Sequence, residues 1–536
     1  MKHLYLITLA AALMSTAVYA QQGVNLPQKN SWLTDSVYPT SHHNPAQTDV
    51  SPVAGPTESQ TLTTADVKTV RSVFVSNPTL KRIGDDRIIF ISGVNGISKV
   101  LATGDKFEQL SYLPYPGFEN VSEQASAEAL DALVAKMDVA RRAHDDAAIL
   151  ALSAVIDEIG FNFRTVANGV YNLIDNDGNH YSVYGGVNVM KSTDDGKVNA
   201  PLRIVKTTNI TNALPVDLAK KINRVVGLGM TYDGNIAVAA PGLVALLDRD
   251  LNMKGYVTFP GELVDNSISI DETGIYVVTS AKMYKVVWTG EKLSFDEADG
   301  GWVSPYDAMD GEKAVALGAL SRGSGTTPTL MGFGNDQDKL VLIADADEKG
   351  TKLVAFWRNE IPKDFKQKAG TLSRRIADQI RVDVSYLTIE PSPVVMGYGT
   401  VVINATFPEP SPARGDIFGN AMTAGVTRLA PRGIQKFVWD PKKNRFEKSW
   451  TNMTVDNTDT MVPHVSAKSN MLYVANKVGL RYEYLGLDWE TGAFKARWTF
   501  PTDSALYNTW GGIGYFLDDG DLITGGFFGA KRVNFN

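Results

Sequence analysis

Seven polar residues stand where repeated strands of this chain would begin, and they are the first candidates for binding chemistry. If the chain forms repeated four-stranded units around one axis, the start of each innermost strand points to the central channel, where ligands of such folds bind. The residues expected at or beside these starts are Asn77, Asn223, Asn266, Thr326, Thr327, Tyr507 and Asn508. We predict that they form a ligand-binding site in the channel.

Two further residues add metal-binding and acid–base chemistry. His464 stands at the same kind of strand start, and Glu390 lies in another unit. Amide and carboxylate oxygens that converge on an axis could hold Ca²⁺, which takes six to eight oxygen ligands, so Asn266 and Glu390 are the predicted metal ligands. A local role is the alternative, because Asn is common at strand starts, where its side chain bonds to nearby backbone. Both interpretations remain open at this point.

One stretch shows the repeated unit most clearly. Residues 463–500 contain four short strand patterns, separated by turn residues, at 464–466, 471–474, 482–488 and 495–500. Four antiparallel strands of this length cannot bury both faces alone, so the unit must stack against copies of itself. Similar units recur along most of the chain from residue 77 onwards. The pattern predicts an all-β fold of the β-propeller type.

Counting these units gives eight blades. Seven is the alternative count, because residues 166–208 are irregular and could be an insertion. The last unit, residues 508–535, is one strand short, whereas the strand pattern at residues 70–75 has no unit of its own. Pairing the two would close the ring and remove an exposed sheet edge.

Three segments fall outside the repeats. Residues 1–20 have the short apolar core and small terminal residues of a signal peptide,. Residues 21–66 are rich in Pro, Ser, Thr and Gln, which predicts a tether or surface wrap with little regular structure,. Residues 122–160 show a helical period and predict a helical-hairpin insertion within the propeller, which spans residues 67–536,.

The composition fits an exported protein. The chain has no Cys, which excludes disulfides, thiol nucleophiles and Cys-based metal sites,. The net charge is −7 and no long run of Lys and Arg occurs, so nucleic acid is not an expected partner,. No segment is apolar enough for a transmembrane helix. We expect a periplasmic or secreted protein.

A tryptophan motif suggests a relationship to other propellers. Residues 488–492, Asp-Trp-Glu-Thr-Gly, followed by Trp498, resemble the blade-locking motif of quinoprotein dehydrogenases. In that family the Asp and Thr-Gly form a turn and the Trp stacks between blades. Quinoprotein alcohol dehydrogenases also place adjacent cysteines against the cofactor, and this chain has none. We therefore expect a packing role for the motif and do not expect PQQ.

The expected channel residues are similar to those of calcium-dependent lactonase propellers of the gluconolactonase and paraoxonase type. This resemblance implies that a metal polarises a lactone carbonyl while a carboxylate or His activates water, which would make His464 or Glu390 the base. Short motifs at residues 230–234, 276–288 and 329–334 resemble a group of secreted bacterial propellers without a described activity.

These observations predict an exported propeller that binds a small molecule, or another exported protein, at its central channel or rim. The cofactor is not defined. A calcium-dependent hydrolase of the lactonase or esterase type is the alternative function. An enzyme would bring Asn266, Glu390 and His464 to one shared site. A scaffold would fill the channel with side chains and carry a large apolar patch on one rim. The fold alone does not decide between them.

Overall fold

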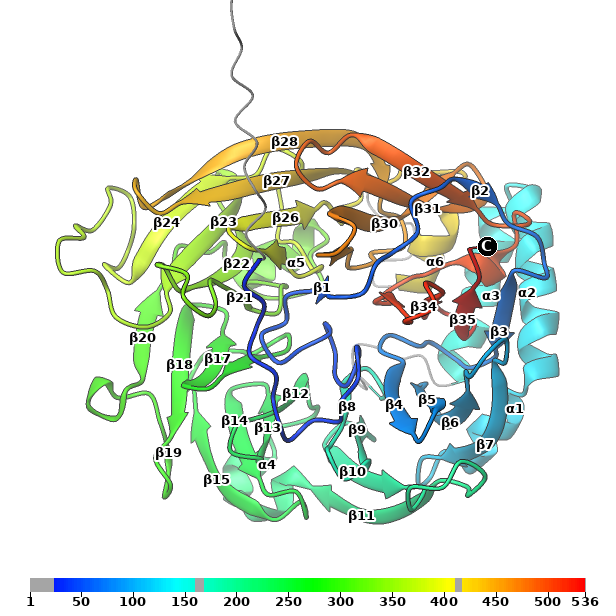
Figure 1. Cartoon of the computed structure of the whole chain (residues 1–536), viewed down its shortest axis with the longest axis horizontal. Coiled ribbons are helices and arrows are strands. Elements are labelled where there is room, and N and C mark those ends of the chain that lie inside the picture. The colour runs from blue at the N-terminus through cyan, green and yellow to red at the C-terminus, as the bar shows by residue number, and fades with distance from the viewer. Residues whose placement is uncertain (1–23, 160–167, 410–416, 536) are drawn as a thin grey trace, which may run out of the picture.

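Eight sheets stand around a common centre in the computed structural model of the chain (Figure 1). The structure describes residues 24–159, 168–409 and 417–535. Most of its regular structure is β-strand, arranged in four-stranded sheets, which confirms the β-propeller fold that the repeats predict. The signal peptide expected at residues 1–20 lies outside the described residues.

Sheets 1 to 4 follow one another along the chain, each with its first strand nearest the centre. Sheet 1 comprises β4 (Thr79–Ile83), β5 (Asp86–Ser92), β6 (Gly96–Leu101) and β7 (Glu108–Pro114). Sheet 2 comprises β8 (Asn172–Ile174), β9 (His180–Tyr184), β10 (Asn188–Thr193) and β11 (Arg203–Asn209). Sheet 3 comprises β12 (Gly227–Met230), β13 (Ile236–Ala240), β14 (Leu243–Leu247) and β15 (Met253–Thr258). Sheet 4 comprises β16 (Ser269–Asp271), β17 (Gly274–Val278), β18 (Lys282–Trp288) and β19 (Leu293–Ser294), with β20 (Trp302–Pro305) also paired to β18.

Sheets 5 to 8 continue the ring, and the last two also take strands from the start of the chain. Sheet 5 comprises β21 (Thr329–Met331), β22 (Leu340–Asp347), β23 (Gly350–Trp357) and β24 (Ile376–Arg381). Sheet 6 comprises β25 (Val394–Met396), β26 (Gly399–Ile403), β27 (Arg432–Asp440) and β28 (Arg445–Asp456). Sheet 7 comprises β29 (His464–Ser466), β30 (Met471–Val478), β31 (Arg481–Asp488) and β32 (Phe494–Thr499), flanked by β1 (Val50–Ser51) and β2 (Gln60–Thr61). Sheet 8 comprises β33 (Tyr515–Phe516), β34 (Leu522–Thr524), β35 (Ala530–Val533) and β3 (Val67–Val70).

Burial along the strands follows their distance from the centre. Strands β13 and β14 are buried at every residue, whereas the outer strand β15 alternates between half-buried and exposed positions. Inner strands lie between two neighbouring sheets, so both of their faces are apolar, while the outer strand turns one face to solvent. Stacking of the sheets therefore supplies the core that no single unit could form.

The ring closes with a strand from the front of the chain. Strand β3 pairs antiparallel with β35, so a closing strand is present, but it begins earlier than the expected range of residues 70–75. Its register with β35 runs from Val67 opposite Val533 to Val70 opposite Ala530. Beyond it Phe74 has a φ of 46°, a left-handed conformation that does not continue an extended strand,. The chain then enters the centre, where the Val75 amide donates to the Gly526 carbonyl at 2.8 Å.

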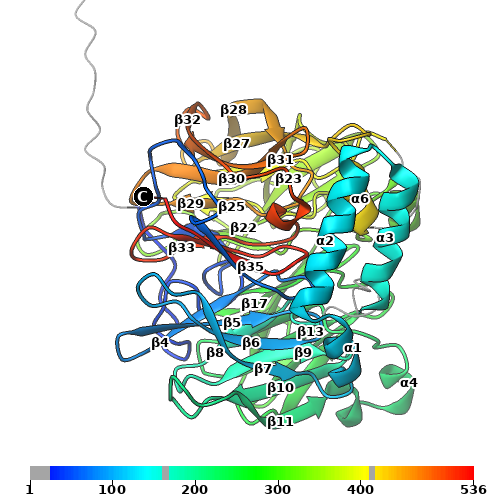
Figure 2. The ribbon, with the colours of Figure 1, turned by 90° about the vertical axis from the view of Figure 1, so that its right-hand side faces the viewer.

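The expected helical insertion is present. It consists of α1 (Glu119–Gln124), α2 (Ala127–Arg142) and α3 (Asp146–Glu158), and the two longer helices pack against one side of the ring (Figure 2). Their buried residues join one apolar cluster with residues of sheets 1, 2, 3 and 8. Shorter helical turns lie in connections: α4 (Val216–Ala219), α5 (Gly311–Leu317), α6 (Ile417–Thr423), and three 3₁₀ turns at Ile210–Ala213, Glu297–Asp299 and Ala505–Tyr507. No helix among the described residues has the length and apolar character to cross a membrane.

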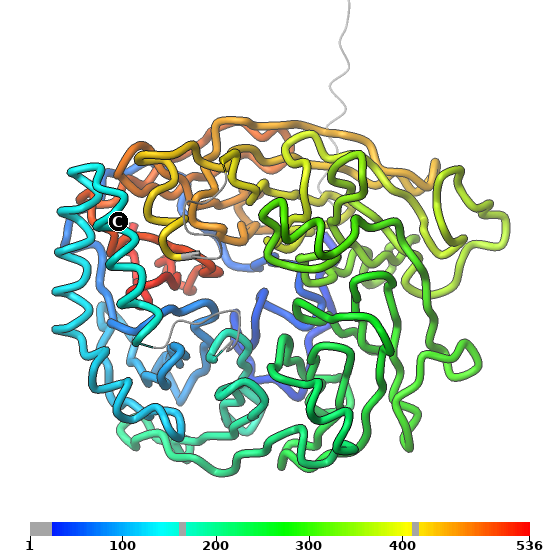
Figure 3. The backbone as a smooth tube through the Cα atoms, turned by 180° about the vertical axis from the view of Figure 1, so that it is seen from behind, coloured from blue at the N-terminus to red at the C-terminus, as the bar shows by residue number. Residues whose placement is uncertain are grey.

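Part of the segment expected to be a tether, residues 38–51, lies instead in the centre of the ring (Figure 3). Residues 38–51, the channel segment, are all buried except Asn44, which is half-buried. The polar composition predicts an exposed tether. The segment is buried instead, because its partners are backbone groups of the sheets. The segment has little regular structure, as expected, since only β1 and β2 form short strands within residues 24–66.

The channel segment bonds to the innermost strands of six sheets in a regular way. In each case one amide of the innermost strand donates to a carbonyl of the segment, at 2.8–3.0 Å. The pairs are Leu80 to Tyr38, Ile174 to Pro39, Ile270 to Pro45, Leu330 to Ala46, Val395 to Thr48 and Val465 to Asp49. Sheet 3 accepts a hydrogen bond from Asn30 at its Met230 carbonyl, and in sheet 8 the ring of Tyr515 stacks on Tyr38. The channel segment thus contacts seven of the eight sheets, and Asn30, which precedes it in the chain, contacts sheet 3.

A charge placed in the channel segment should destabilise the whole ring. Ala46 is 1% exposed, so Ala46→Glu buries a carboxylate without a partner, and we expect the free energy of unfolding to fall by about 3–5 kcal/mol,. The matched control is Ala154→Glu, on the exposed face of α3. Urea unfolding followed by tryptophan fluorescence measures both. Equal stability of the two variants would contradict the central role of the segment.

Candidate functional site

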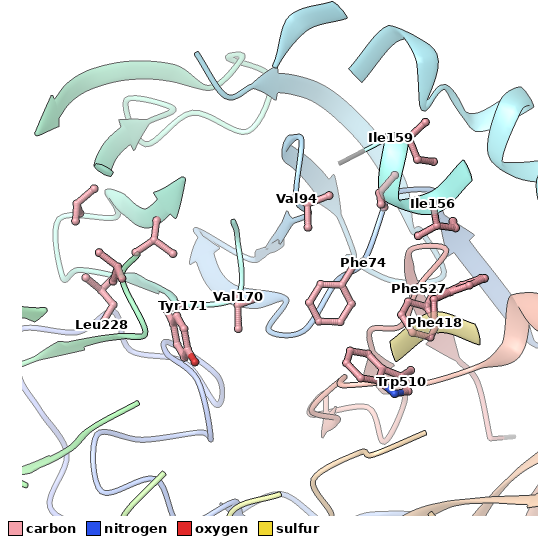
Figure 4. Packing of buried hydrophobic residues seen from close by; sticks show 14 of the residues in the cluster. Phe74, Val94, Ile156, Ile159, Val170, Tyr171, Leu228, Phe418, Trp510 and Phe527 are labelled. Atoms are coloured by element: carbon pink, nitrogen blue, oxygen red, sulfur yellow. The ribbon is translucent and has the colours of Figure 1, made fainter. Parts of the chain in front are cut away.

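A cavity of about 120 Å³ remains in the channel on the side of the channel segment that Ser41 and His42 face. We call it the channel cavity. Its polar wall includes Ser76, Asn77, Tyr171, Asn266, Thr327, Glu390 and Ser392, and its apolar wall includes Phe74, Val170, Leu320 and Trp510. Figure 4 shows Phe74, the adjacent Val170 and Tyr171, and Trp510, which come from three separate segments of the chain. A smaller cavity of about 60 Å³ adjoins it and shares Leu320, Glu390, Thr460 and Trp510.

Asn266 organises one part of this wall. Its Oδ1 accepts hydrogen bonds from the Ser267 amide at 2.7 Å and from the hydroxyls of Tyr171 and Thr327, each at 3.3 Å. Its Nδ2 donates to the Gly325 carbonyl. The amide therefore fulfils the local role that Asn plays at strand starts, and it also holds two hydroxyl groups at the cavity.

Asn77 ties the channel segment to the sheets. Its Oδ1 accepts from the Tyr38 hydroxyl at 2.7 Å, and its Nδ2 donates to the Val170 carbonyl at 2.7 Å. Both polar ends of the side chain are occupied by protein groups. Asn77 thus fixes the geometry of the cavity wall, and its amide is not the first candidate for contact with a ligand.

Glu390 is the carboxylate of the channel cavity. Its Oε2 accepts a hydrogen bond from Ser321 at 3.0 Å, but its buried Oε1 has no partner among the described residues. Burial raises the pKa of Glu390 to about 7, with further contributions from the negative charges of Asp265 and Asp345. A side chain at Gly325 would meet this carboxyl group at 2.5 Å, so glycine is required there for the close approach,. At neutral pH the group exists in both protonation states.

A histidine and an aspartate of the channel segment form a second polar group at this cavity. His42 lines the cavity, and its Nδ1 lies 2.7 Å from Oδ2 of Asp49, whose side chain is fully buried. An aspartate that is hydrogen-bonded to one ring nitrogen of a histidine fixes the orientation of the imidazole. The other ring nitrogen then faces away from the carboxylate. Both residues have left-handed backbones, with φ of 57° and 55°. The sequence does not predict this pair, because the polar composition of residues 21–66 indicates a tether.

The structure gathers some of the predicted site residues and separates others. Asn77, Asn266, Thr327 and Glu390 line the channel cavity. Four other predicted ligand residues lie elsewhere. Asn223 is exposed, Thr326 is buried with its hydroxyl 2.8 Å from that of Ser324, Tyr507 stacks on Phe500, and Asn508 bonds to Ala505 and Phe527.

Asn508 nevertheless supports the cavity. Its Oδ1 accepts from the amides of Trp510 and Phe527 at 3.3 and 2.9 Å, and its Nδ2 donates to the Ala505 carbonyl at 2.6 Å. These bonds hold the loop that brings the ring of Trp510 to the cavity wall. A residue expected to bind a ligand therefore positions another residue that lines the site.

His464, the predicted base, lies in an aromatic cluster and does not line the channel cavity. Its ring stacks on Tyr473 with centroids 5.5 Å apart, and its Nδ1 is 3.1 Å from the Tyr484 hydroxyl. Burial, with a smaller contribution from His43, holds the pKa of His464 well below its usual range. The strand start was predicted well, but the side chain packs against Tyr473, Phe516 and the ring of His43 and does not line the channel cavity.

The tryptophan motif acts as a turn and a contact between sheets. The Asp488 carboxylate accepts from the amides of Glu490 and Thr491 at 3.1 and 2.9 Å, which forms the turn. Trp489 is buried, and Lys436 of sheet 6 lies 4.4 Å from the centre of its ring while donating to its carbonyl. This cation–π contact and hydrogen bond join sheets 6 and 7.

The cavity offers few free oxygens for a cation. Across the described residues, no three His, Asp or Glu side chains form a group that could hold a metal ion. Of the two predicted metal ligands, Asn266 already uses its Oδ1 as an acceptor for protein donors. Glu390 has one oxygen without such a donor among the residues described. Calcium usually binds six to eight oxygens, so the donor set fits it poorly.

Comparison with known proteins assigns the chain to no family. No protein-family model matches it. An uncharacterized protein of Archaeoglobus fulgidus is 32% identical over 331 residues, 58% of this chain. The match spans 60% of the length of that relative.

Among solved structures, a europium-containing methanol dehydrogenase matches 91% of this chain and 90% of its own, with a TM-score of 0.47 and 9% identity. A candidate 6-phosphogluconolactonase of Bacteroides fragilis matches 60% of this chain and 81% of its own, with a TM-score of 0.34 and 13% identity. At these TM-scores and identities, neither of the two structures supports a conclusion about activity. The protein is a β-propeller, as its own sheets show.

The raised pKa of Glu390 should make stability depend on pH. The folded state holds this proton up to about pH 7, whereas the ordinary pKa is 4.5, so the free energy of unfolding should fall as pH rises from 4.5 to about 7,. The loss approaches roughly 3 kcal/mol, since one pKa unit corresponds to about 1.4 kcal/mol. Glu390→Gln should remove this part of the pH dependence and unfold at higher urea than the parent at pH 8. The exposed Glu360→Gln is the control, and identical pH profiles for Glu390→Gln and the parent would refute the assignment.

Proposed function

We propose that this protein is an exported β-propeller that binds a small polar molecule in the channel cavity. The observation that carries the proposal is the buried Oε1 of Glu390, which has no hydrogen-bond donor within the described part of the chain. Buried polar atoms nearly always have a hydrogen-bond partner, so one without a partner at the wall of a cavity indicates that a ligand or water binds there. Asn266, with the hydroxyls of Tyr171 and Thr327, provides polar groups on the same wall.

The size and lining of the cavity define the ligand. A volume of about 120 Å³, with about 60 Å³ adjoining, is close to that of a cavity that holds benzene, ~150 Å³, and below the ~300 Å³ at which drug-sized sites begin,. A ring of five or six atoms with hydroxyl groups fits this space. A hydroxyl would donate to Glu390 Oε1, and the ring of Trp510 offers an apolar face. Small hydroxylated lactones and cyclic polyols have this chemistry.

A panel of such lactones and polyols should raise the melting temperature of the protein. A ligand that binds only the folded state adds about 2.7 kcal/mol at one hundred times its Kd. Glu390→Met removes the acceptor and should abolish the shift, whereas Glu390→Gln should retain part of it. Asn266→Leu should weaken binding, and Asn223→Leu, at an exposed residue outside the cavity, should not. Shifts that are the same in all variants, or absent throughout the panel, would defeat the proposal and favour a partner-binding scaffold.

A second candidate function at the same cavity is hydrolysis of a small lactone or ester, favoured by the His42–Asp49 pair. His42 would take a proton from water as the water oxygen attacks the carbonyl carbon. The ring C–O bond would then break, and the leaving oxygen would take the proton of the Glu390 carboxyl group. Solvent would return the proton from His42 to Glu390. A base oriented by one carboxylate and a separate acid with a raised pKa is a recurrent arrangement in hydrolases.

This reaction requires His42 and Asp49, whereas the calcium-dependent alternative requires a bound metal ion. A general base typically contributes a factor of 10²–10⁴, so His42→Asn and Asp49→Asn should lower the rate of lactone hydrolysis by about that much. A chelator should leave the parent rate unchanged, because the step uses protein groups alone. Loss of activity with chelator and its recovery with Ca²⁺ would instead support the lactonase-like mechanism. The release of acid from δ-valerolactone, followed with a pH indicator, measures each case.

A further inference from the structure

Another cavity lies on the other side of the channel segment. It has a volume of about 450 Å³, within the usual range for small-molecule sites,. Residues 26–52 provide most of its wall, and Leu80, Arg82 and Asp518 provide the rest. We call it the second cavity. It shares no lining residue with the channel cavity, since Ser41 and His42 face one and His43 and Asn44 face the other.

The wall of the second cavity is held in place by the sheets. Asn30 donates to the Met230 carbonyl at 2.9 Å, the Thr34 amide donates to the Ile174 carbonyl at 3.0 Å, and the Leu80 amide donates to Tyr38. Segments fixed to sheets 1, 2 and 3 thus surround the space. A cavity formed in this way exists before any ligand arrives, which lowers the cost of binding.

The lining is mostly apolar and carries no unpaired charge among the residues described. The apolar contributors include Leu26, Leu33, Val37, Val50 and Leu80. The four charged residues of the lining form two pairs, Arg82 with Asp518 at 2.6 Å and Lys29 with Asp35. A charged ligand would therefore find no counter-ion here, whereas a neutral apolar one would lose little on leaving water.

One buried side chain gives the cavity a polar anchor. The His43 side chain is 2% exposed, and neither of its ring nitrogens has a hydrogen-bond partner within the described ranges. The nearest carboxylate oxygen, Asp49 Oδ1, is 3.9 Å from His43 Nδ1, which is too far for a hydrogen bond,. The neighbouring Asn44 also has a buried Oδ1 without a partner there. Burial lowers the pKa of His43, so its neutral ring offers one donor and one acceptor,.

We propose that the second cavity binds a neutral, largely apolar small molecule whose single hydrogen-bonding group reaches His43. The site is separate from the small polar ligand of the channel cavity, and neither proposal requires the other. The chemical class follows from three features together: an apolar wall, charges that are already paired, and one buried imidazole without a partner in the described chain.

N-Phenyl-1-naphthylamine tests this proposal, because it is neutral, apolar, carries one N–H group and fluoresces strongly on leaving water. We expect saturable binding of one molecule per chain to the purified protein. Val37→Trp places an indole in the cavity from a half-buried position and should weaken binding at least tenfold. Val216→Trp, the same change at an exposed residue of α4, is the matched control and should bind as the parent does.

A second variant keeps the test decisive if Val37→Trp fails to fold, which circular dichroism would reveal. His43→Asn removes the imidazole, and Asn tolerates the left-handed backbone at this residue, where φ is 70°,. It should weaken binding of the probe about tenfold, the typical effect of losing one buried hydrogen bond. Absent or non-saturable binding to the parent, or unchanged affinity in His43→Asn and folded Val37→Trp, would overturn the proposal. Glu390→Met should leave probe binding intact, which separates this site from the channel cavity.

Discussion

The structure depends on one requirement, that the backbone amides facing the propeller channel must find acceptors. The innermost strand of a sheet has an unpaired edge, and a buried amide without a partner costs about 1–3 kcal/mol. The channel segment provides a carbonyl for one such amide in six sheets. Because consecutive or nearly consecutive residues serve different sheets, one short stretch ties much of the ring together. The closing strand β3 performs the corresponding task at the outside of sheet 8.

The same requirement explains the two cavities. To direct carbonyls toward sheets on all sides, the segment must bend sharply, and His42, His43, Gln47 and Asp49 all have positive φ. Non-glycine residues adopt this conformation rarely, and where the fold enforces it function is often found nearby. The bend at His42 and His43 places the first side chain on the channel cavity and the second on the other. The segment thus divides the channel and lines both halves.

Some of these features follow from the sequence and others do not. Strands and the helical insertion were predicted because their apolar residues repeat with a fixed period, as at Leu130, Leu133 and Met137 of α2, all buried. The residues of the channel segment show no repeating apolar pattern, since successive residues contact different sheets. Its polar side chains bond to one another. Asn266 was found because strand starts converge on the axis, and Glu390 because a carboxylate oxygen near that axis could join it at a cation,. His464 shares that position along its strand, but its side chain packs against Phe516 and Tyr473 between the sheets.

Asp49 contributes both to the fold and to the candidate site. Its carbonyl accepts the amide of Val465, its Oδ2 bonds His42, and its Oδ1 faces His43 at 3.9 Å without a hydrogen bond. The same residue holds the path of the segment through its carbonyl and the ring of His42 through its carboxylate, so the orientation of His42 and the path of the segment depend on each other. A ligand that bonds His43 would alter the surroundings of the carboxylate that holds His42. Two cavities that share no wall residue are therefore linked through one side chain, and the link exists only because the segment occupies the channel.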